Sequence, residues 1–298
     1  MRGFNLWAAK ILAMNWRIGL TLLVFSCTSN NGENDLSSFR GPRDLALIDE
    51  RLPEASGLAS SVVNNDYLWA LNDGQNPAEV YLIDTTAHVK MTCKLSVANR
   101  DWEEIAVGPG PDESKNYIYV GEIGDNNAVY DMKYIYRFEE PALDSEVKEI
   151  TLTDTLRIQI SDGERDTETM MIDPFSKDLY LISKREDSVG VYKVSQPFTH
   201  DIMTAQKVAT IPFFKIVAGS FSADGLEILL KDYDHIYYWM RSKDESLEHA
   251  LLRKPEQLPY EREAQGESIT WKRDGSGFYT LSETNPGKPA YLKFYKRN

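Results

Sequence analysis

The chain has 298 residues, of which 42% are hydrophobic and 11% aromatic, and it carries a formal net charge of −13. This composition is sufficient for a packed globular core and differs from that of a disordered chain. The acidic excess, with no long run of lysine or arginine, predicts no nucleic-acid partner, because binding to phosphates requires clustered basic side chains.

The first 27 residues have the features of an export signal. Arg17 is followed by the apolar run 18–25 and then by a polar segment. The apolar run is too short to span a bilayer. Either Met1 or Met14 could be the true start, because the segment from Met14 would by itself form a compact signal.

The segment Val24-Phe25-Ser26-Cys27 resembles the lipobox of bacterial lipoproteins, although Phe25 replaces the small residue usual there. The resemblance implies that Cys27 is acylated and becomes the first residue of the mature protein. Simple secretion with cleavage nearby is the alternative. We therefore expect a lipoprotein signal peptide over residues 1–27, a flexible polar tether over residues 28–43 and a folded domain over residues 44–298.

This organisation predicts an exported, monomeric protein whose lipid anchor makes the membrane a partner. The expected location is the outer membrane or the cell surface, with the periplasm or the medium as alternatives. Cys93 is the second of the two cysteines, so the mature domain is expected to lack an internal disulfide. It lies in an alternating apolar and polar segment, which predicts a buried strand residue.

From residue 44 onward, short runs of β-branched and aromatic residues alternate with clusters of Asp, Asn, Gly and Pro. This pattern is typical of an all-β chain. A short motif of acidic and small residues followed by apolar residues recurs, and its copies begin at Glu54, Asp101, Asp166, Ala218 and Gln265. A repeat of roughly 50 residues with four short strands is typical of a propeller blade. The sequence therefore predicts a five-bladed β-propeller.

The two ends of this domain are expected to close the ring together. The last repeat contains only three strand-like segments, whereas residues 44–52 are strand-like and precede the first motif. An N-terminal strand would thus complete the last blade and cover its open edge. A six-bladed propeller with an extra blade within residues 101–165 is an alternative, and a β-sandwich is another.

Blade geometry predicts a rim of charged residues around the axis. The first strand of a blade runs along the axis and the second returns antiparallel, so residues just before the first and just after the second meet at one rim. The residues expected there as ligand-binding groups are Glu54, Asp73, Asp101, Glu122, Asp125, Asn126, Asp166, Lys184, Arg185, Lys231 and Glu283. Glu103, Glu168 and Glu267 occupy equivalent motif positions and are the candidate metal ligands.

Three interpretations of this rim remain open. The three glutamates could share a hard cation such as Ca²⁺, which prefers oxygen ligands. The lysines and the arginine of the rim could instead neutralise the carboxylates as solvated ion pairs. The rim could also bind an extracellular small molecule or peptide. Residues 121–127 form the densest polar cluster, which is either a glycine-rich turn or a source of oxygen ligands, without EF-hand spacing.

Sequence signals for catalysis are weak. The four histidines lie outside the recurring motifs, and neither zinc-ligand spacing nor a Gly-x-Ser-x-Gly elbow is present. Two rim carboxylates could cleave a glycosidic bond, but nothing selects a pair. The sequence therefore leaves open whether the protein is an enzyme.

Several motifs together resemble a family of exported bacterial β-propeller lipoproteins that is similar to the SdiA-regulated and phytase-like esterase propellers. These motifs are Glu54-x-Ser-Gly-Leu, Leu68-Trp-x-x-Asn-Asp, Asp101-Trp-Glu-x-Ile-Ala, Gly124-Asp-Asn, Ile135-Tyr-Arg-x-x-Glu-Pro and Gly219-Ser-Phe-Ser-x-Asp-Gly. The resemblance covers nearly the whole mature chain. It implies the propeller fold and says little about chemistry, because propellers host many functions.

The chain departs from the expected pattern at Ser220, where an Asp is expected. That departure would remove one carboxylate from the rim. Phytase-like enzymes use calcium ions to bring an anionic substrate to an acidic face, which would suit this acidic chain only if metals bind. We therefore expect binding of a small ligand or divalent cation at the acidic rim, with a calcium-assisted phosphoesterase or a related hydrolase as the alternative.

Overall fold

The computed structural model describes residues 38–199 and 201–298. The predicted signal peptide with Cys27 and residues 28–37 of the predicted tether lie outside these residues. The last part of that tether belongs to the fold, because Phe39 is 1% exposed and forms a β-bridge with Arg297. The packed domain thus begins before residue 44.

Hydrogen-bonded strands form four sheets in the described residues. The first contains, in spatial order, β2 (Ala55–Ser60), β3 (Tyr67–Asn72), β4 (Glu79–Asp84), β5 (Val89–Leu95) and β9 (Val147–Ile150). The second contains β11 (Thr167–Ile172), β12 (Leu179–Ser183), β13 (Val189–Val194), β14 (Ile202–Ile211), β10 (Asp154–Ile160), β8 (Lys133–Glu139), β7 (Asn116–Glu122) and β6 (Trp102–Pro109).

The remaining two sheets come from the C-terminal third of the chain and the first described strand. One contains β15 (Ala218–Phe221), β16 (Glu227–Lys231), β17 (Ile236–Met240) and β18 (Glu256–Leu258), with the short helix α1 (Leu247–Leu251) between the last two in sequence. The other contains β19 (Ser268–Trp271), β20 (Gly277–Leu281), β21 (Tyr291–Lys296) and β1 (Arg43–Leu47).

The eight-stranded sheet consists of two antiparallel runs of four strands, β6-β7-β8-β10 and β11-β12-β13-β14. A parallel pairing of β10 with β14 joins the two runs at their outer edges. The extra length of residues 101–165 supplies β9, which pairs in parallel with β5 of the first sheet. That length therefore adds an outer strand to a neighbouring sheet.

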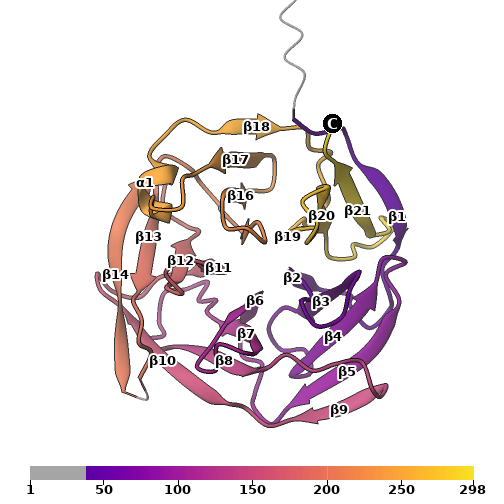
Figure 1. Cartoon of the computed structure of the whole chain (residues 1–298), viewed down its shortest axis with the longest axis horizontal. Helices are drawn as coiled ribbons and strands as arrows, with labels where there is room; N and C mark the ends of the chain where they lie inside the picture. Colours follow the sequence, from indigo (N-terminus) through magenta and orange to yellow (C-terminus); the bar gives the residue numbers. More distant parts are fainter. Residues whose placement is uncertain (1–37, 200) are drawn as a thin grey trace, which may run out of the picture. The chain divides into compact units, whose positions relative to one another are not determined.

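The strands form a propeller-like all-β fold around a central axis. Within residues 38–298, the strands β2, β6, β11, β15 and β19 lie innermost, and each contacts the next until β19 meets β2 (Figure 1). β1 pairs antiparallel with β21, so a strand from the N-terminal side completes the last sheet, as expected from the sequence. The repeats thus follow one another around the axis, which a two-layered sandwich does not allow.

The apolar core is divided into clusters between neighbouring sheets. Trp69 and Trp102, for example, belong to one cluster shared by the first sheet and β6-β7-β8. Leu281 and Leu58 belong to the cluster where the last sheet meets the first. Because both faces of most sheets are covered in this way, central strands such as β3 and β12 are apolar and buried along nearly their whole length. Cys93 is a free, buried strand residue, as predicted.

In the part of the chain that the structure describes, no helix has the length and apolar character needed to cross a lipid bilayer.

Candidate functional site

The inner strands begin, and the second strands end, at the same end of the axis, and carboxylates collect there. We call this set of residues the acidic mouth: Asp73, Asp101, Glu103, Asp166, Glu168, Glu267 and Glu283, with Lys184. Oxygen atoms of Asp73, Asp101 and Glu103 lie within 4.8 Å of one another. Oxygens of Glu103, Asp166 and Glu168 form a second group within the same limit. The sequence-based prediction that distant motifs meet at one rim holds for these residues.

Two β-bulges place the central glutamates of the mouth. The pairing of β6 with β7 shifts register between Trp102 and Glu104, and the pairing of β11 with β12 shifts between Thr167 and Thr169. Glu103 and Glu168 are the extra residues at these shifts. A bulged residue leaves the regular ladder, and its side chain is re-aimed relative to its neighbours. The equivalent motif positions therefore direct two carboxylates to the same point.

Lys184 neutralises one side of the mouth. Its Nζ lies 2.5 Å from Oε1 of Glu168 and 3.7 Å from Oε1 of Glu267. The Tyr233 hydroxyl donates a hydrogen bond to the same Glu267 oxygen, and the Lys184 ammonium lies 5.4 Å from the centre of the Tyr233 ring. The nearby carboxylates raise the pKa of Lys184 despite its burial, so this side chain stays charged.

On the other side of the mouth, no cation of the described residues forms an ion pair with Asp73, Asp101 or Glu103; Lys133 and Arg100 act on Asp101 only at longer range. The Glu103 side chain is 5% exposed, and no hydrogen bond or ion pair joins it to any residue in the described ranges. Gly124 approaches closely, because a Cβ at that position would collide with Glu103 Oε1 and lie 2.6 Å from Asp101 Oδ2. A Cβ at Gly74 would lie 2.9 Å from Asp101 Oδ1. Glycine at both positions leaves room for the oxygens.

Burial and mutual repulsion raise the pKa values of these carboxyl groups. Burial is the largest cause for Glu103, whose pKa is well above its ordinary value, and the charges of Glu168 and Asp73 add to it. Burial raises the pKa of Glu168 to about 8, although Lys184 opposes the shift. Burial and the charge of Glu267 raise the pKa of Glu283 to about 9. Asp73 is raised to a pKa of about 6, mainly by burial.

Two predicted rim residues have partners away from the axis. The Glu122 carboxylate lies 3.0 Å from Arg100 Nε and accepts hydrogen bonds of 3.2 Å from Trp102 Nε1 and the Tyr136 hydroxyl. It is a buried structural acceptor between two strands. Asp125 accepts bonds of 2.8 and 2.9 Å from the backbone N–H groups of residues 129 and 130, so it caps its own turn.

Asp166 of the mouth and the remaining predicted residues have partners around the edge of the mouth. Asp166 is paired with Arg185, which also donates to the Asn126 amide oxygen. Lys231 is fully buried, donates to the carbonyl oxygens of residues 232 and 266, and lies 4.6 Å from the centre of the Tyr260 ring. Burial lowers the pKa of Lys231 to about 8. Glu54 is exposed and accepts a 2.6 Å hydrogen bond from the Asn76 amide.

Two residues outside the predicted set also shape this region. Tyr233 follows a second strand in the fourth repeat, but its contact with Glu267 depends on the neighbouring sheet. Glu104 lies deeper, is 1% exposed and accepts a 3.0 Å hydrogen bond from the Ile105 N–H. The backbone N–H groups of Gly219 and Leu58, on two other inner strands, also favour its charged form, although Oε2 of Glu104 has no hydrogen-bond partner among the described residues. Glu104 is not among the residues predicted from the sequence, because the other repeats carry no acidic residue at this motif position.

Ser220 does not lie at the acidic mouth. It belongs to β15 and lines a cavity at the opposite ends of the inner strands. The expectation that a serine at this position removes a rim carboxylate is therefore wrong. The reason is that β15 begins at Ala218 and has no bulge, so Ser220, its third residue, lies beyond the mouth.

Comparisons with known proteins find structures of similar fold but do not assign the chain to a family. No protein-family model and no curated protein sequence matches the chain. Among solved structures, a glucose dehydrogenase is similar over 86% of this chain and 99% of its own, with 10% identity and a TM-score of 0.50. A nidogen/laminin complex gives 12% identity, coverage of 76% and 72%, and a TM-score of 0.44. The likeness to the glucose dehydrogenase concerns the fold alone.

Proposed function

We propose that the protein binds a divalent cation of the calcium type at the acidic mouth, through Asp73, Asp101 and Glu103. The buried Glu103 carboxylate, which has no hydrogen-bond or ion-pair partner in residues 38–199 and 201–298, carries this proposal. A buried carboxylate is costly unless a counter-charge or hydrogen bonds compensate it. Three carboxylates with oxygens within 4.8 Å of one another offer the hard oxygen ligands that Ca²⁺ prefers.

The cation is assigned to this group because the other carboxylates are already neutralised. Asp166 pairs with Arg185, and Glu168 pairs with Lys184. A cation bound by Glu168 would have to displace the Lys184 ammonium. Glu103 belongs to both groups of neighbouring carboxylate oxygens. Of the three metal ligands predicted from the sequence, it is the one that we assign to the cation directly. Glu267 contributes to the ion pair with Lys184.

The fold and location proposals rest on separate observations. We propose five blades, supported by the closed cycle of inner strands β2, β6, β11, β15 and β19. We also propose export and a lipid anchor at Cys27, supported by the lipobox-like sequence. Incorporation of labelled palmitate into the full chain, and its loss in Cys27→Ser, tests the anchor.

Calcium titration of the purified protein tests the cation proposal. The chelator-treated protein should gain thermal stability on addition of Ca²⁺, because a ligand that binds only the folded state stabilises it by mass action. Calorimetry should show apparent affinity rising between pH 6 and pH 8.5, since carboxyl groups with raised pKa values must release protons to bind the metal. Glu103→Gln should abolish the calcium shift.

Glu113→Gln is the matched control, because Glu113 is exposed, pairs with Lys177 at 2.6 Å and lies at the opposite ends of the inner strands. It should retain the full calcium response. An absence of any calcium effect in the parent protein, or an unchanged effect in Glu103→Gln, would overturn the proposal. Hydrolysis of a phosphate monoester by the calcium-loaded protein, lost in Glu103→Gln, would extend it to the phosphoesterase alternative.

A further inference from the structure

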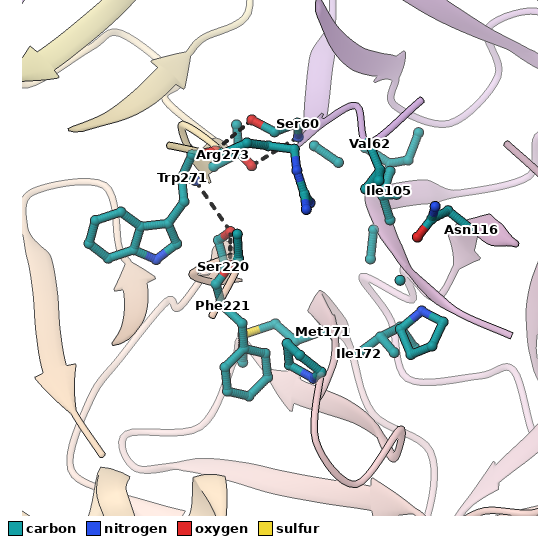
Figure 2. Close-up of a pocket in the computed structure, with 18 of the residues that line it drawn as sticks. Ser60, Val62, Ile105, Asn116, Met171, Ile172, Ser220, Phe221, Trp271 and Arg273 are labelled. Carbon is teal, nitrogen blue, oxygen red and sulfur yellow. Dashed lines mark hydrogen bonds between the residues drawn. The ribbon is translucent and has the colours of Figure 1, made fainter. Parts of the chain in front are cut away.

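A cavity of about 250 Å³ lies at the far ends of the inner strands, away from the acidic mouth. Its lining includes the last residues of strands β2, β6, β11, β15 and β19, so every inner strand contributes to it (Figure 2). Glu104 lies in β6 between Glu103 of the mouth and Ile105, which lines the cavity. No residue of the acidic mouth lines this cavity.

The cavity wall combines apolar side chains with polar groups, and its exposed surface is somewhat more polar than apolar. Ile105, Met171, Ile172 and Phe221 surround it (Figure 2). Ser60 and Ser220 add hydroxyl groups, and both hydrogen-bond to the backbone of Trp271. The Ser60 hydroxyl donates to the Trp271 carbonyl at 2.5 Å, and the Ser220 hydroxyl accepts from the Trp271 N–H at 3.4 Å. Pockets that bind organic ligands combine apolar walls with a few placed polar groups and usually have volumes from roughly 300 Å³ upward, so this smaller cavity suits only a small ligand.

Arg273 supplies an unmatched positive charge at this cavity. It lies two residues after the end of β19, and its side chain extends over the cavity (Figure 2). None of the described carboxylates lies within ion-pair distance of it; Glu140 acts on it only at longer range. Glu140 is itself occupied, because it accepts hydrogen bonds from Trp69 Nε1 at 2.9 Å and from Ser61 at 2.5 Å.

The other two charged residues of the lining form ion pairs with residues that do not line the cavity. Lys115 lies 2.6 Å from Glu139, and Glu113 lies 2.6 Å from Lys177. The net charge that faces the cavity is therefore that of the Arg273 guanidinium. A guanidinium stays protonated at all physiological pH values, and its planar fork matches the two oxygens of a carboxylate.

We propose that this cavity binds a small organic carboxylate, whose charged group pairs with Arg273 and whose aliphatic or aromatic body lies among Ile105, Ile172 and Phe221. The apolar side chains of the wall favour such a molecule over an inorganic anion, because a bare anion leaves their surface unfilled. The site is independent of the cation proposed for the acidic mouth, since none of Asp73, Asp101 and Glu103 lines the cavity.

Binding of benzoate and 4-methylpentanoate to the purified protein, measured by calorimetry and ligand-observed NMR, tests this proposal. Both should bind saturably, and neutral benzamide and inorganic phosphate should bind at least about tenfold more weakly. Arg273→Met should reduce carboxylate affinity by at least about tenfold. Ser220→Leu should also weaken binding, because the larger side chain fills part of the cavity while the Arg273 charge remains.

Two controls keep the outcome specific. Arg253→Met removes an arginine that pairs with Glu245 and does not line the cavity, so it should leave benzoate affinity unchanged. Glu103→Gln should also leave it unchanged, which separates this site from the mouth. The proposal fails if neither carboxylate binds, if benzamide or phosphate binds as tightly as benzoate, or if Arg273→Met binds benzoate like the parent while keeping its thermal stability.

Discussion

The two ends of the same inner strands have opposite chemistry. At their beginnings, Glu103 and Glu168 meet in a crowd of carboxylates with one buried lysine. At their far ends, Ile172 and Phe221 line a cavity of mixed polarity, where Arg273 has no ion-pair partner among the described residues. The strands are only four to eight residues long, so this change occurs within a few residues. A ring of short strands thus carries two different sites on one scaffold.

The stability of the two ends depends on charge to different degrees. The acidic mouth is stable only because Lys184 and raised pKa values reduce the repulsion among its carboxylates. The cavity end has almost no charge to compensate. Substitutions that remove a charge should therefore destabilise the mouth strongly and the cavity end little.

The largest effect is expected from Lys184→Met. Removal of one partner from a buried ion pair leaves an uncompensated charge, which typically costs about 3–5 kcal/mol of folding free energy. The thermal midpoint and the free energy of unfolding should fall most at about pH 9, because Glu168, with a pKa of about 8 beside Lys184, is ionised there in the parent. Both should fall less at pH 5, where Glu168 is protonated in both proteins. Lys207→Met is the control, because Lys207 is 37% exposed and pairs with Asp162 at 3.2 Å. Equal losses in both variants would show that the mouth does not depend on this lysine.

An intermediate effect is expected from Glu104→Leu, which acts between the two ends. The variant removes the acceptor of the Ile105 N–H and a carboxylate whose charge is favoured by the backbone N–H groups of Gly219 and Leu58. Buried donors without a partner cost about 1–3 kcal/mol. Glu104→Gln should lose much less, because it keeps an acceptor and because burial raises the pKa of Glu104 well above its ordinary range. Chemical denaturation measures both, and a fully stable leucine variant would contradict the bridging role.

A smaller effect is expected from the pH dependence of the mouth. A carboxyl whose folded pKa is raised stabilises most below its unfolded pKa, near 4.3, and that contribution is lost as pH rises through the folded value. With folded pKa values of about 8 for Glu168 and about 9 for Glu283, the chelator-treated protein should lose stability from pH 5 to pH 8. Above pH 8 the lowered pKa of Lys231 acts in the opposite direction.

Glu283→Gln sharpens this test. The variant cannot ionise but keeps an N–H donor for Glu267, so at pH 8 it should be more stable than the parent by about 1–2 kcal/mol, with solvent screening limiting the gain. At pH 5 the two proteins should be equal in unfolding free energy. Glu261→Gln, at an exposed position paired with Lys293, should leave the pH profile unchanged. A parallel profile for Glu283→Gln and the parent would mean that Glu283 does not titrate in this range.

Several features of this protein follow from the sequence alone. The recurring motif identified the inner strands, because strands buried on both sides require apolar runs between polar turns. The strand-like segment before the first motif identified β1 as the partner of β21. The acidic residues at the motif starts identified the mouth, since adjacent repeats place equivalent residues at the same end of the axis. These are local patterns or consequences of repetition, which a single sequence contains.

Only the tertiary structure decided which carboxylates are neutralised and where each side chain points. Glu122 is the last residue of β7, as Asn72 beside Asp73 is the last of β3, yet it is held by Arg100 and Trp102. Two bulges direct Glu103 and Glu168, and Gly124, beyond the next strand, makes room for Glu103. Arg273 and Ser220 reach one cavity only because their strands are neighbours in the ring. Such pairings depend on contacts between distant segments, and periodicity along the chain carries no information about them.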